Sequence, residues 1–321
     1  MKRYIKPIWQ AFVIVFLKTL FALSRVLPLP VMLAVGSFFG RICYRLSARY
    51  RKVASRNLKL AFGDSLTEAQ RRRITRDVFV NFAKCAVEFP VTARMTAEQV
   101  RRYALVRPED MERVRALLDR KTGVIAVSAH LGNFELMARR FAVEGIKFTV
   151  VVRNDDNKAM ARLLNDVRGE SGYAVVGRGD AARVLLRKLR TPGEVVGMLP
   201  DQKSDETFVP FFGAVCGTVA GPAVMALRTG APIVPAFCVR GRDGRHHVVF
   251  GNIIEAAVSD KPEEDIERLM TQVNLEIEKV VRQYPEQWLW LHDRWRVKPP
   301  AEVAARWQAR GQAEPRTLAA S

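Results

Sequence analysis

The stretch that decides the fold of this chain is Gly123-Val124-Ile125-Ala126-Val127-Ser128-Ala129-His130-Leu131-Gly132-Asn133-Phe134-Glu135. Its first half is a short apolar run, typical of a buried strand. Its second half opens a helix that we expect over 133–143, closed by Gly145. The histidine between the halves therefore stands at the carboxyl end of a strand, where open α/β sheets bind their ligands. Gly132 permits the turn between strand and helix.

His130 and Glu135 are the candidate catalytic pair of this stretch. Imidazole is the side chain best suited to move protons near pH 7, and a carboxylate beside it fixes its tautomer and stabilises its charged form. On a continuous helix, residues five apart lie about 140° from a common face, so the two side chains meet only if the chain turns between them. The alternative is a surface histidine followed by a glutamate that is favoured by the helix dipole.

From Thr122 onward, strand-like runs alternate with helical patterns. The expected strands lie at 124–128, 148–152, 174–176, 195–199, 233–239 and 247–254. The expected helices lie at 133–143, 157–170, 180–189, 221–229 and 263–281. This alternation predicts an α/β domain with a mostly parallel sheet flanked by helices. Asp243-Gly244 predicts a hairpin that makes the far edge antiparallel, and we interpret His246 and His247 beside it as ordinary strand residues rather than metal ligands.

The first fifth of the chain differs in character from the rest. Residues 1–63 contain twelve Lys and Arg and no Asp or Glu, which leaves +7 of the formal net charge of +19 for the remainder. Between Pro7 and Gly40 the only charged residues are Lys18 and Arg25, in an otherwise largely apolar segment. We therefore expect residues 1–48 to form a membrane anchor with a basic juxtamembrane part that faces anionic lipids.

How this anchor meets the membrane is open at the level of sequence. A spanning helix needs about 20 apolar residues, but Lys18, Pro28 and Pro30 interrupt the segment. A helix that lies in the membrane plane satisfies the same flanking charges. A cleaved signal peptide ending near Ala22-Leu23-Ser24 is the third possibility.

The middle and the end of the chain complete the predicted organisation. A basic amphipathic helix over 50–62 ends at Gly63, and a capping box at Ser65-Leu66-Thr67-Glu68 opens a long helix that runs towards Pro90. We expect the α/β domain to cover 49–297 and a poorly ordered tail to follow over 298–321. The cysteines show no close pairing and no metal-ligand spacing, which suits a reducing compartment; they are Cys43, Cys85, Cys216 and Cys238.

With these motifs in place, the chain resembles the bacterial lipid A late acyltransferases of the lauroyl and myristoyl type, distant relatives of the glycerophosphate acyltransferases. The resemblance covers roughly residues 10 to 296 and rests on six blocks that agree in order and spacing. These blocks are 129–135, 151–154, 199–203, 209–213 with Thr218, 230–235, and 285–292. The last block contains Trp288 and Trp290, which we interpret as core packing rather than an interfacial anchor.

The resemblance implies an enzyme that moves a fatty acyl chain from an acyl carrier protein thioester to a hydroxyl of a lipid A precursor. His130 would be the general base and Glu135 would hold its imidazole, with no covalent intermediate, no cofactor beyond the acyl carrier protein co-substrate, and no metal. The expected location is the bacterial inner membrane, with the catalytic domain on the cytoplasmic face. The residues expected to bind substrate are Asn133, Arg153, Asp201 and Gln202.

Two other functions fit part of the sequence. A lysophospholipid or glycerol-phosphate acyltransferase would use the same histidine and acid, but that wider group typically has Asp at the acidic position and a Phe-Pro-Glu-Gly-type string. This chain has Glu135 and Val209-Pro210-Phe211-Phe212-Gly213 instead. A membrane-tethered nucleic-acid-binding protein explains the positive charge but gives no reason for the His130 block, and no binding module is recognised. The expected partners are therefore acyl carrier protein, a lipid A precursor and anionic inner-membrane lipids, and no nucleic acid.

Overall fold

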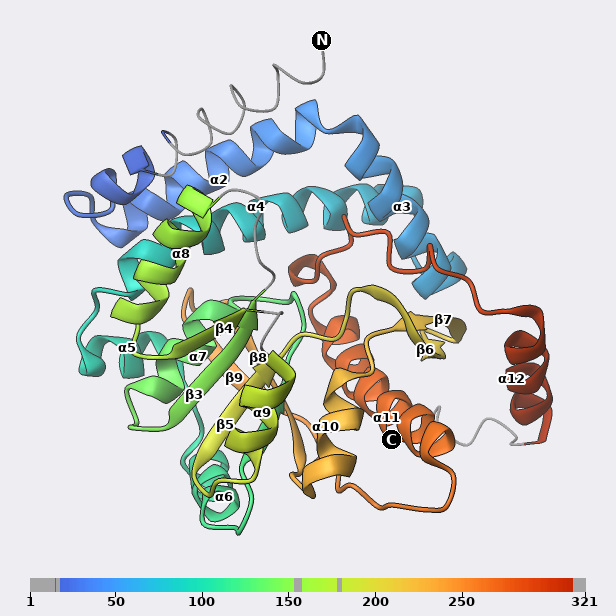
Figure 1. The fold of residues 1–321 in the computed structure, drawn as a ribbon. Helices are drawn as coiled ribbons and strands as arrows, with labels where there is room; N and C mark the ends of the chain where they lie inside the picture. The colour runs from blue at the N-terminus through green and yellow to red at the C-terminus, as the bar shows by residue number, and fades with distance from the viewer. Residues whose placement is uncertain (1–14, 16–17, 153–157, 178–180, 314–321) are drawn as a thin grey trace.

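A computed structural model of the chain describes residues 15, 18–152, 158–177 and 181–313, and Figure 1 shows its fold. A seven-stranded sheet has the order β1-β9-β8-β2-β5-β3-β4, and β6 and β7 form a separate hairpin. The strands are β1 (Ala104–Leu105), β2 (Val124–Val127), β3 (Lys147–Val152), β4 (Ala174–Gly177), β5 (Glu194–Met198), β6 (Lys203–Phe211), β7 (Ala214–Thr218), β8 (Ile233–Arg240) and β9 (His246–Phe250). Strands β2, β3, β4, β5 and β8 run parallel, which confirms the predicted fold class.

Helices cover both faces of this sheet (Figure 1). They are α2 (Leu29–Leu46), α3 (Ala48–Phe62), α4 (Glu68–Thr92), α5 (Ala97–Tyr103), α6 (Pro108–Leu118), α7 (Phe134–Ala142), α8 (Lys158–Glu170), α9 (Ala181–Leu189), α10 (Gly221–Thr229), α11 (Pro262–Gln283) and α12 (Ala301–Ala313), with short 3₁₀ turns at Gly63–Ser65 and Pro285–Gln287. Thr67 caps α4 in a reciprocal capping box with Gln70. The box therefore lies two residues beyond the expected one, because Ser65 belongs to the preceding 3₁₀ turn.

The central strand β2 is buried along its whole length. Ile125 and Val127 pack into the core on the face covered by α9, α10 and α11. Val124 and Ala126 pack into the opposite core, beside α6 and α7. Successive side chains of a strand point to opposite faces, so a strand covered on both sides must be apolar throughout. The continuous apolar run that predicted this strand follows from that position.

The amino-terminal helix α2 packs antiparallel against α4. A Cβ added at Gly36 would lie 3.0 Å from the Ala83 carbonyl oxygen, and one added at Gly40 would lie 2.7 Å from the Val80 Cα. The spacing Gly36-Ser37-Phe38-Phe39-Gly40 thus brings the two helix backbones into close approach, as small residues four apart do in membrane helices. In Figure 1, α2 runs along α4 at one side of the molecule.

Two parts of the fold differ from the expectation. The predicted antiparallel pair β8–β9 is present, but β1 pairs with β9 on its outer side, so β9 is not the edge of the sheet. Part of the tail that was predicted to be poorly ordered forms α12. The indole nitrogen of Trp307 donates a hydrogen bond to the Phe208 carbonyl at 2.9 Å, and Arg310 pairs with Glu267 at 3.1 Å. These contacts anchor a segment whose composition alone indicates little structure.

Candidate active site

The loop over residues 128–133, which we call the His130 loop, leaves the carboxyl end of β2. Its first amide, that of Ser128, donates to the Met198 carbonyl at 3.0 Å and so continues the pairing with β5. Gly132 has φ +59°, and a Cβ there would lie 2.0 Å from the Cys238 carbonyl oxygen. Since no larger residue fits, the sharp turn that carries His130 requires glycine at this position. The predicted role of Gly132 is confirmed.

Asp201, and not Glu135, is the carboxylate that contacts the imidazole. Its Oδ1 lies 2.8 Å from His130 Nδ1, and its Oδ2 accepts from the His130 backbone amide at 2.8 Å. The Trp288 indole N–H donates to the same Oδ2 at 2.9 Å. The Asp201 side chain is 2% exposed, whereas that of His130 is 22% exposed. Asp201 was expected to bind substrate; the structure instead places it behind the imidazole.

These contacts determine the proton positions on His130. An ionised carboxylate accepts only, so the hydrogen on Nδ1 points at Asp201 and the lone pair of Nε2 faces the site. Burial by itself lowers the pKa of the imidazole, but the charge of Asp201, its hydrogen bond and the charge of Glu135 together raise it above the ordinary value. Burial by itself raises the pKa of Asp201, but the His130 charge and hydrogen bonds hold it below the ordinary value. Gln202 Nε2 lies 3.3 Å from His130 Nε2.

Glu135 belongs to a second group of side chains at the same site. Arg168 Nη2 contacts Glu135 Oε1 at 2.5 Å, and the Tyr173 hydroxyl donates to Oε2. Arg168 also donates to the Asn165 side-chain oxygen at 3.2 Å. Burial and then the Glu135 charge raise the pKa of Tyr173, which keeps the phenol protonated. Glu135 therefore joins α7 to α8 and still acts on His130 through its charge.

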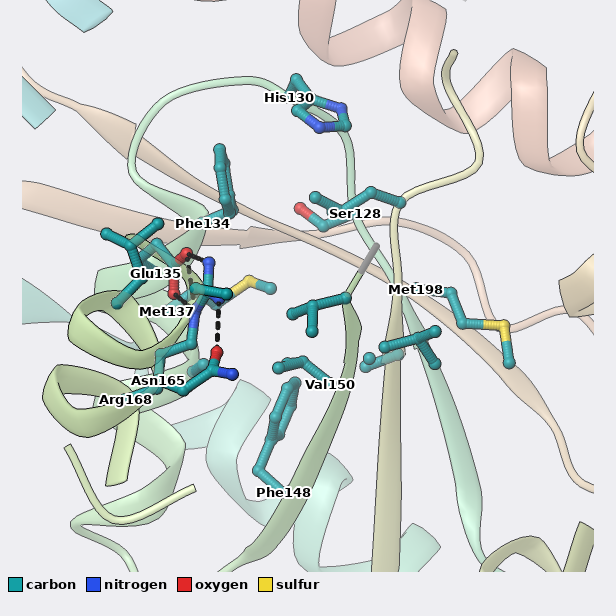
Figure 2. A pocket seen from close by; sticks show the side chains of 18 residues that line it. Ser128, His130, Phe134, Glu135, Met137, Phe148, Val150, Asn165, Arg168 and Met198 are labelled. Atoms are coloured by element: carbon teal, nitrogen blue, oxygen red, sulfur yellow. Dashed lines mark hydrogen bonds and ion pairs between the residues drawn. The ribbon is translucent and has the colours of Figure 1, made fainter. Parts of the chain in front are cut away.

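A cavity of about 340 Å³ lies directly beside His130. Figure 2 shows His130 at one end of the cavity and Phe148 at the other, with the Glu135–Arg168 pair along one side. The polar residues that line it are Ser128, His130, Glu135, Asn165 and Arg168. The rest of the lining is apolar and comes from β2, β3, α7, α8, β5 and the residue after β5: Ala126, Phe134, Met137, Ala138, Phe148, Val150, Val151, Val152, Ala161, Leu164, Gly197, Met198 and Leu199.

The remaining predicted site residues have different positions. Asn133 was expected to bind substrate, but the residue is only 2% exposed. Its Oδ1 accepts from the Leu136 amide at 3.0 Å and its Nδ2 donates to Glu88 at 2.9 Å, so both polar ends are used within the fold. Arg153 lies outside the described residues. Within the described ranges, no group of three or more His, Cys, Asp or Glu side chains could hold a metal ion.

The segment 285–292 supports the His130 loop from the other side. The Leu289 amide donates to the His130 carbonyl at 3.0 Å, and the Gly132 amide donates to the Gln287 carbonyl at 3.0 Å. Trp288 and Trp290 are 1% and 0% exposed, as expected for core packing. Trp288 adds the hydrogen bond to Asp201, which sequence reasoning missed. The missed residues of the site are thus Trp288, Asn165, Arg168 and Tyr173.

Fold and site together define a class. An imidazole backed by a buried carboxylate can remove a proton from a hydroxyl, and a mainly apolar cavity beside it can hold a hydrocarbon chain. This combination is that of an α/β acyltransferase. Residues 3–297 match the family model described as bacterial lipid A biosynthesis acyltransferase, and the chain belongs to this family.

Individual relatives agree with this assignment. The chain is 29% identical over 279 residues to the lipid A biosynthesis lauroyltransferase of Escherichia coli (strain K12), which covers 85% of this chain and 88% of that one. It is 26% identical over 284 residues to the palmitoleoyltransferase of the same strain, covering 86% and 88%. It is 24% identical over 277 residues to the myristoyltransferase, covering 85% and 82%. The protein is therefore an acyltransferase of lipid A biosynthesis.

Proposed function

We propose that this enzyme transfers a fatty acyl chain from an acyl carrier protein thioester to a hydroxyl of a lipid A precursor, with His130 as general base and Asp201 as the carboxylate that orients it. The observation that carries this proposal is the His130–Asp201 contact of 2.8 Å at the mouth of a mainly apolar cavity. The names of the relatives, which differ only in the acyl chain, supply the acceptor class.

The chemistry follows from the tautomer. His130 Nε2 takes the hydroxyl proton while the oxygen attacks the thioester carbonyl carbon, and Asp201 stabilises the imidazolium that forms. The tetrahedral intermediate then collapses, the carbon–sulfur bond breaks, and the proton on Nε2 passes to the departing thiolate. Asn133 Oδ1 already accepts from the Leu136 amide, so the amides of Phe134 and Glu135 are the first-turn donors of α7 suited to hold the oxyanion. Gln202 would hydrogen-bond the incoming hydroxyl, and Arg153 would bind a substrate phosphate.

The apolar cavity would hold the acyl chain, with Phe148 as its floor. Phe148 also lines a small, wholly apolar second cavity behind it, together with Val114, Leu117, Leu118, Val124, Ala126, Phe141, Ile146, Val195, Val234, Ala236 and Phe250. Removing the ring therefore joins the two spaces. The depth available to an acyl chain would then increase.

Phe148→Ala should shift the enzyme towards longer acyl chains. Each additional buried methylene contributes about 0.8 kcal/mol, so kcat/KM should rise about fourfold per methylene relative to wild type until the enlarged cavity is full. The measurement is kcat/KM for a series of carrier-protein thioesters that differ by two carbons. Phe148→Leu serves as the control that keeps most of the volume. An unchanged chain-length profile in a folded Phe148→Ala protein would contradict the role of this cavity.

The helix α2 would lie in the plane of an anionic membrane rather than cross it. By length and composition it is the single helix among the described residues that could span a bilayer. It packs along α4, however, and next to Ala83, which faces Gly36, the same helix touches the His130 loop through Cys85, so a spanning α2 would draw the α/β domain into hydrocarbon. Its outer side exposes Val31, Phe38 and Leu46 between basic residues, the pattern of an in-plane helix.

Two variants with one exposed cysteine each test this orientation. Arg25→Cys and Arg49→Cys, each with the exposed native cysteine removed by Cys43→Ser, place exposed thiols in the basic residues that flank the two ends of α2. An in-plane helix predicts that an impermeant thiol reagent labels both from the same side of sealed membrane vesicles. If α2 spans the membrane, the reagent labels only one of the two thiols in vesicles of a given orientation. Val258→Cys, exposed in the loop before α11, reports the side of the catalytic domain.

The acceptor and the donor are tested with the purified enzyme. It should acylate a lipid A precursor with an acyl carrier protein thioester, and act at least tenfold less well on lysophosphatidic acid or with the coenzyme A thioester. If the enzyme prefers the lysophospholipid, the lipid A precursor is not its acceptor. Preferential use of coenzyme A would replace the proposed donor.

A further inference from the structure

One buried carboxylate near the site takes no part in the reaction described above. The side chain of Glu88, in the second half of α4, has no solvent exposure. Arg240 donates to it from both terminal nitrogens at 2.7 Å, and Asn133 Nδ2 donates at 2.9 Å. The Tyr103 hydroxyl also donates to it, and His246 Nε2 lies 3.3 Å away. These four partners come from α5, β8, β9 and the residue that caps α7.

Two connections lead from this carboxylate to the His130 loop. The direct one is Asn133, whose amide is oriented by Glu88 so that its oxygen caps α7 at the Leu136 amide. The indirect one runs through Arg240. Its backbone amide donates to the Gln287 side chain at 2.8 Å, and the Gln287 carbonyl accepts from the Gly132 amide at 3.0 Å. Gly132 and Asn133, two consecutive residues of the His130 loop, are therefore both held in place through the Glu88 carboxylate.

The same face of α4 touches the loop at a further point. Cys85, one turn before Glu88, donates its thiol hydrogen to the Gly132 carbonyl at 3.2 Å. Burial by itself raises the pKa of Glu88, but the hydrogen bonds from His246 and Arg240 hold it well below the ordinary value, so the carboxylate is ionised. A buried ion pair is a weak source of stability compared with apolar residues of the same volume, but in some proteins such a pair specifies geometry.

We propose that Glu88 is a positioning residue for acyl transfer: it holds Asn133, and with it the His130 loop, in the geometry that brings the imidazole onto Asp201. This inference rests on the proposed function of His130 as the base. Glu88 is not among the residues that line the cavity. Its effect must therefore pass through the loop.

Glu88→Gln keeps the shape of the side chain and removes its charge. A displacement of about 1 Å of a catalytic group, caused by a change away from the reacting atoms, can cost about 100-fold in rate, so we expect kcat per folded molecule to fall by up to about that factor while KM stays within about twofold. The pKa of the His130 imidazole should also fall towards its ordinary value, because a displaced loop loosens its contact with Asp201. Glu135 also acts on the His130 pKa through its charge. It should keep its contact with Arg168 in Glu88→Gln, so it should not cause the shift.

The imidazole pKa is measured by NMR on the full chain with labelled histidines, where His130→Ala assigns one of the four histidine signals. Asn133→Asp places a second carboxylate against Glu88 and should be more impaired than Glu88→Gln. The double variant E88Q/N133D restores an amide–carboxylate hydrogen bond with its direction reversed, and aspartate still caps a helix. It should recover at least about tenfold of the kcat lost in Asn133→Asp, as coupled residues do.

Glu267→Gln is the matched control. It removes a buried carboxylate that pairs with Arg306 and Arg310 between α11 and α12, and should lower the melting temperature without changing kcat or the His130 pKa. The proposal is overturned if Glu88→Gln behaves in the same way. Wild-type protein that acylates no acceptor would contradict the proposed function alone, since the NMR shift still decides whether Glu88 positions His130.

Discussion

His130→Ala should lower kcat for acyl transfer by about 10⁴-fold, the upper end of what one general base contributes. An alcohol is almost wholly protonated at neutral pH, so its attack on a thioester depends on a base within reach of the hydroxyl. The imidazole is 22% exposed and packs at the cavity mouth; its removal leaves the surrounding core in place. The melting temperature should therefore stay within a few degrees of wild type.

The measurement is a steady-state transfer assay on purified protein, with folding checked by thermal unfolding. His247→Ala is the matched control, because its side chain is 43% exposed and pairs with Asp243 at the β8–β9 turn. It should keep wild-type activity. A folded His130→Ala enzyme that retains more than about a tenth of wild-type activity would show that the imidazole is not the base.

Asp201→Asn should lower kcat by about 10³- to 10⁴-fold, because the imidazole loses the negative charge that fixes its tautomer and stabilises its protonated form. The effect on pH dependence has a definite sign. The base must be neutral, and the neighbouring carboxylate raises the His130 pKa, so wild-type activity should fall off on the acid side at a pH above the ordinary imidazole value of about 6.5. In Asp201→Asn this acid limb should move to lower pH.

Glu135→Gln separates the two carboxylates. It keeps Asp201 on the imidazole and changes only the group bound by Arg168 and Tyr173. We expect a loss of kcat at least about tenfold smaller than that of Asp201→Asn, with a smaller shift of the acid limb. A larger loss of kcat in Glu135→Gln than in Asp201→Asn would mean that Glu135 orients the imidazole, as the sequence motif alone indicates.

The sequence predicted the elements of the α/β domain because their signals are local. The strand β2, the glycine turn and α7 each follow from neighbouring residues, and the parallel sheet follows from their alternation. The pairing of His130 with Asp201 is not local, since the two residues are 71 apart in sequence. It depends on β2 and β5 being neighbours, with Val127 opposite Met198. Both side chains lie three residues beyond that pair, a relation that only the strand order reveals.

The other differences between the predicted and the observed site also arise from contacts between distant parts of the chain. Glu135 is five residues from His130, and the motif suggested contact, but the Glu135 carboxylate instead binds Arg168 of α8 and Tyr173, the residue before β4. Asn133 faces Glu88 in α4, which no pattern in the His130 stretch indicates. Trp288 was correctly placed in the core, yet its indole hydrogen bond to Asp201 depends on where the chain returns after α11.

The most direct test of the account is mass spectrometry of lipid A from cells that lack this gene and carry either the wild-type gene or the His130→Ala variant. We predict that the wild-type gene adds the mass of one acyl chain to lipid A and that the variant, produced at the same level, adds none. Lipid A of identical mass with and without the wild-type gene, or the same added chain from the His130→Ala variant, would contradict it.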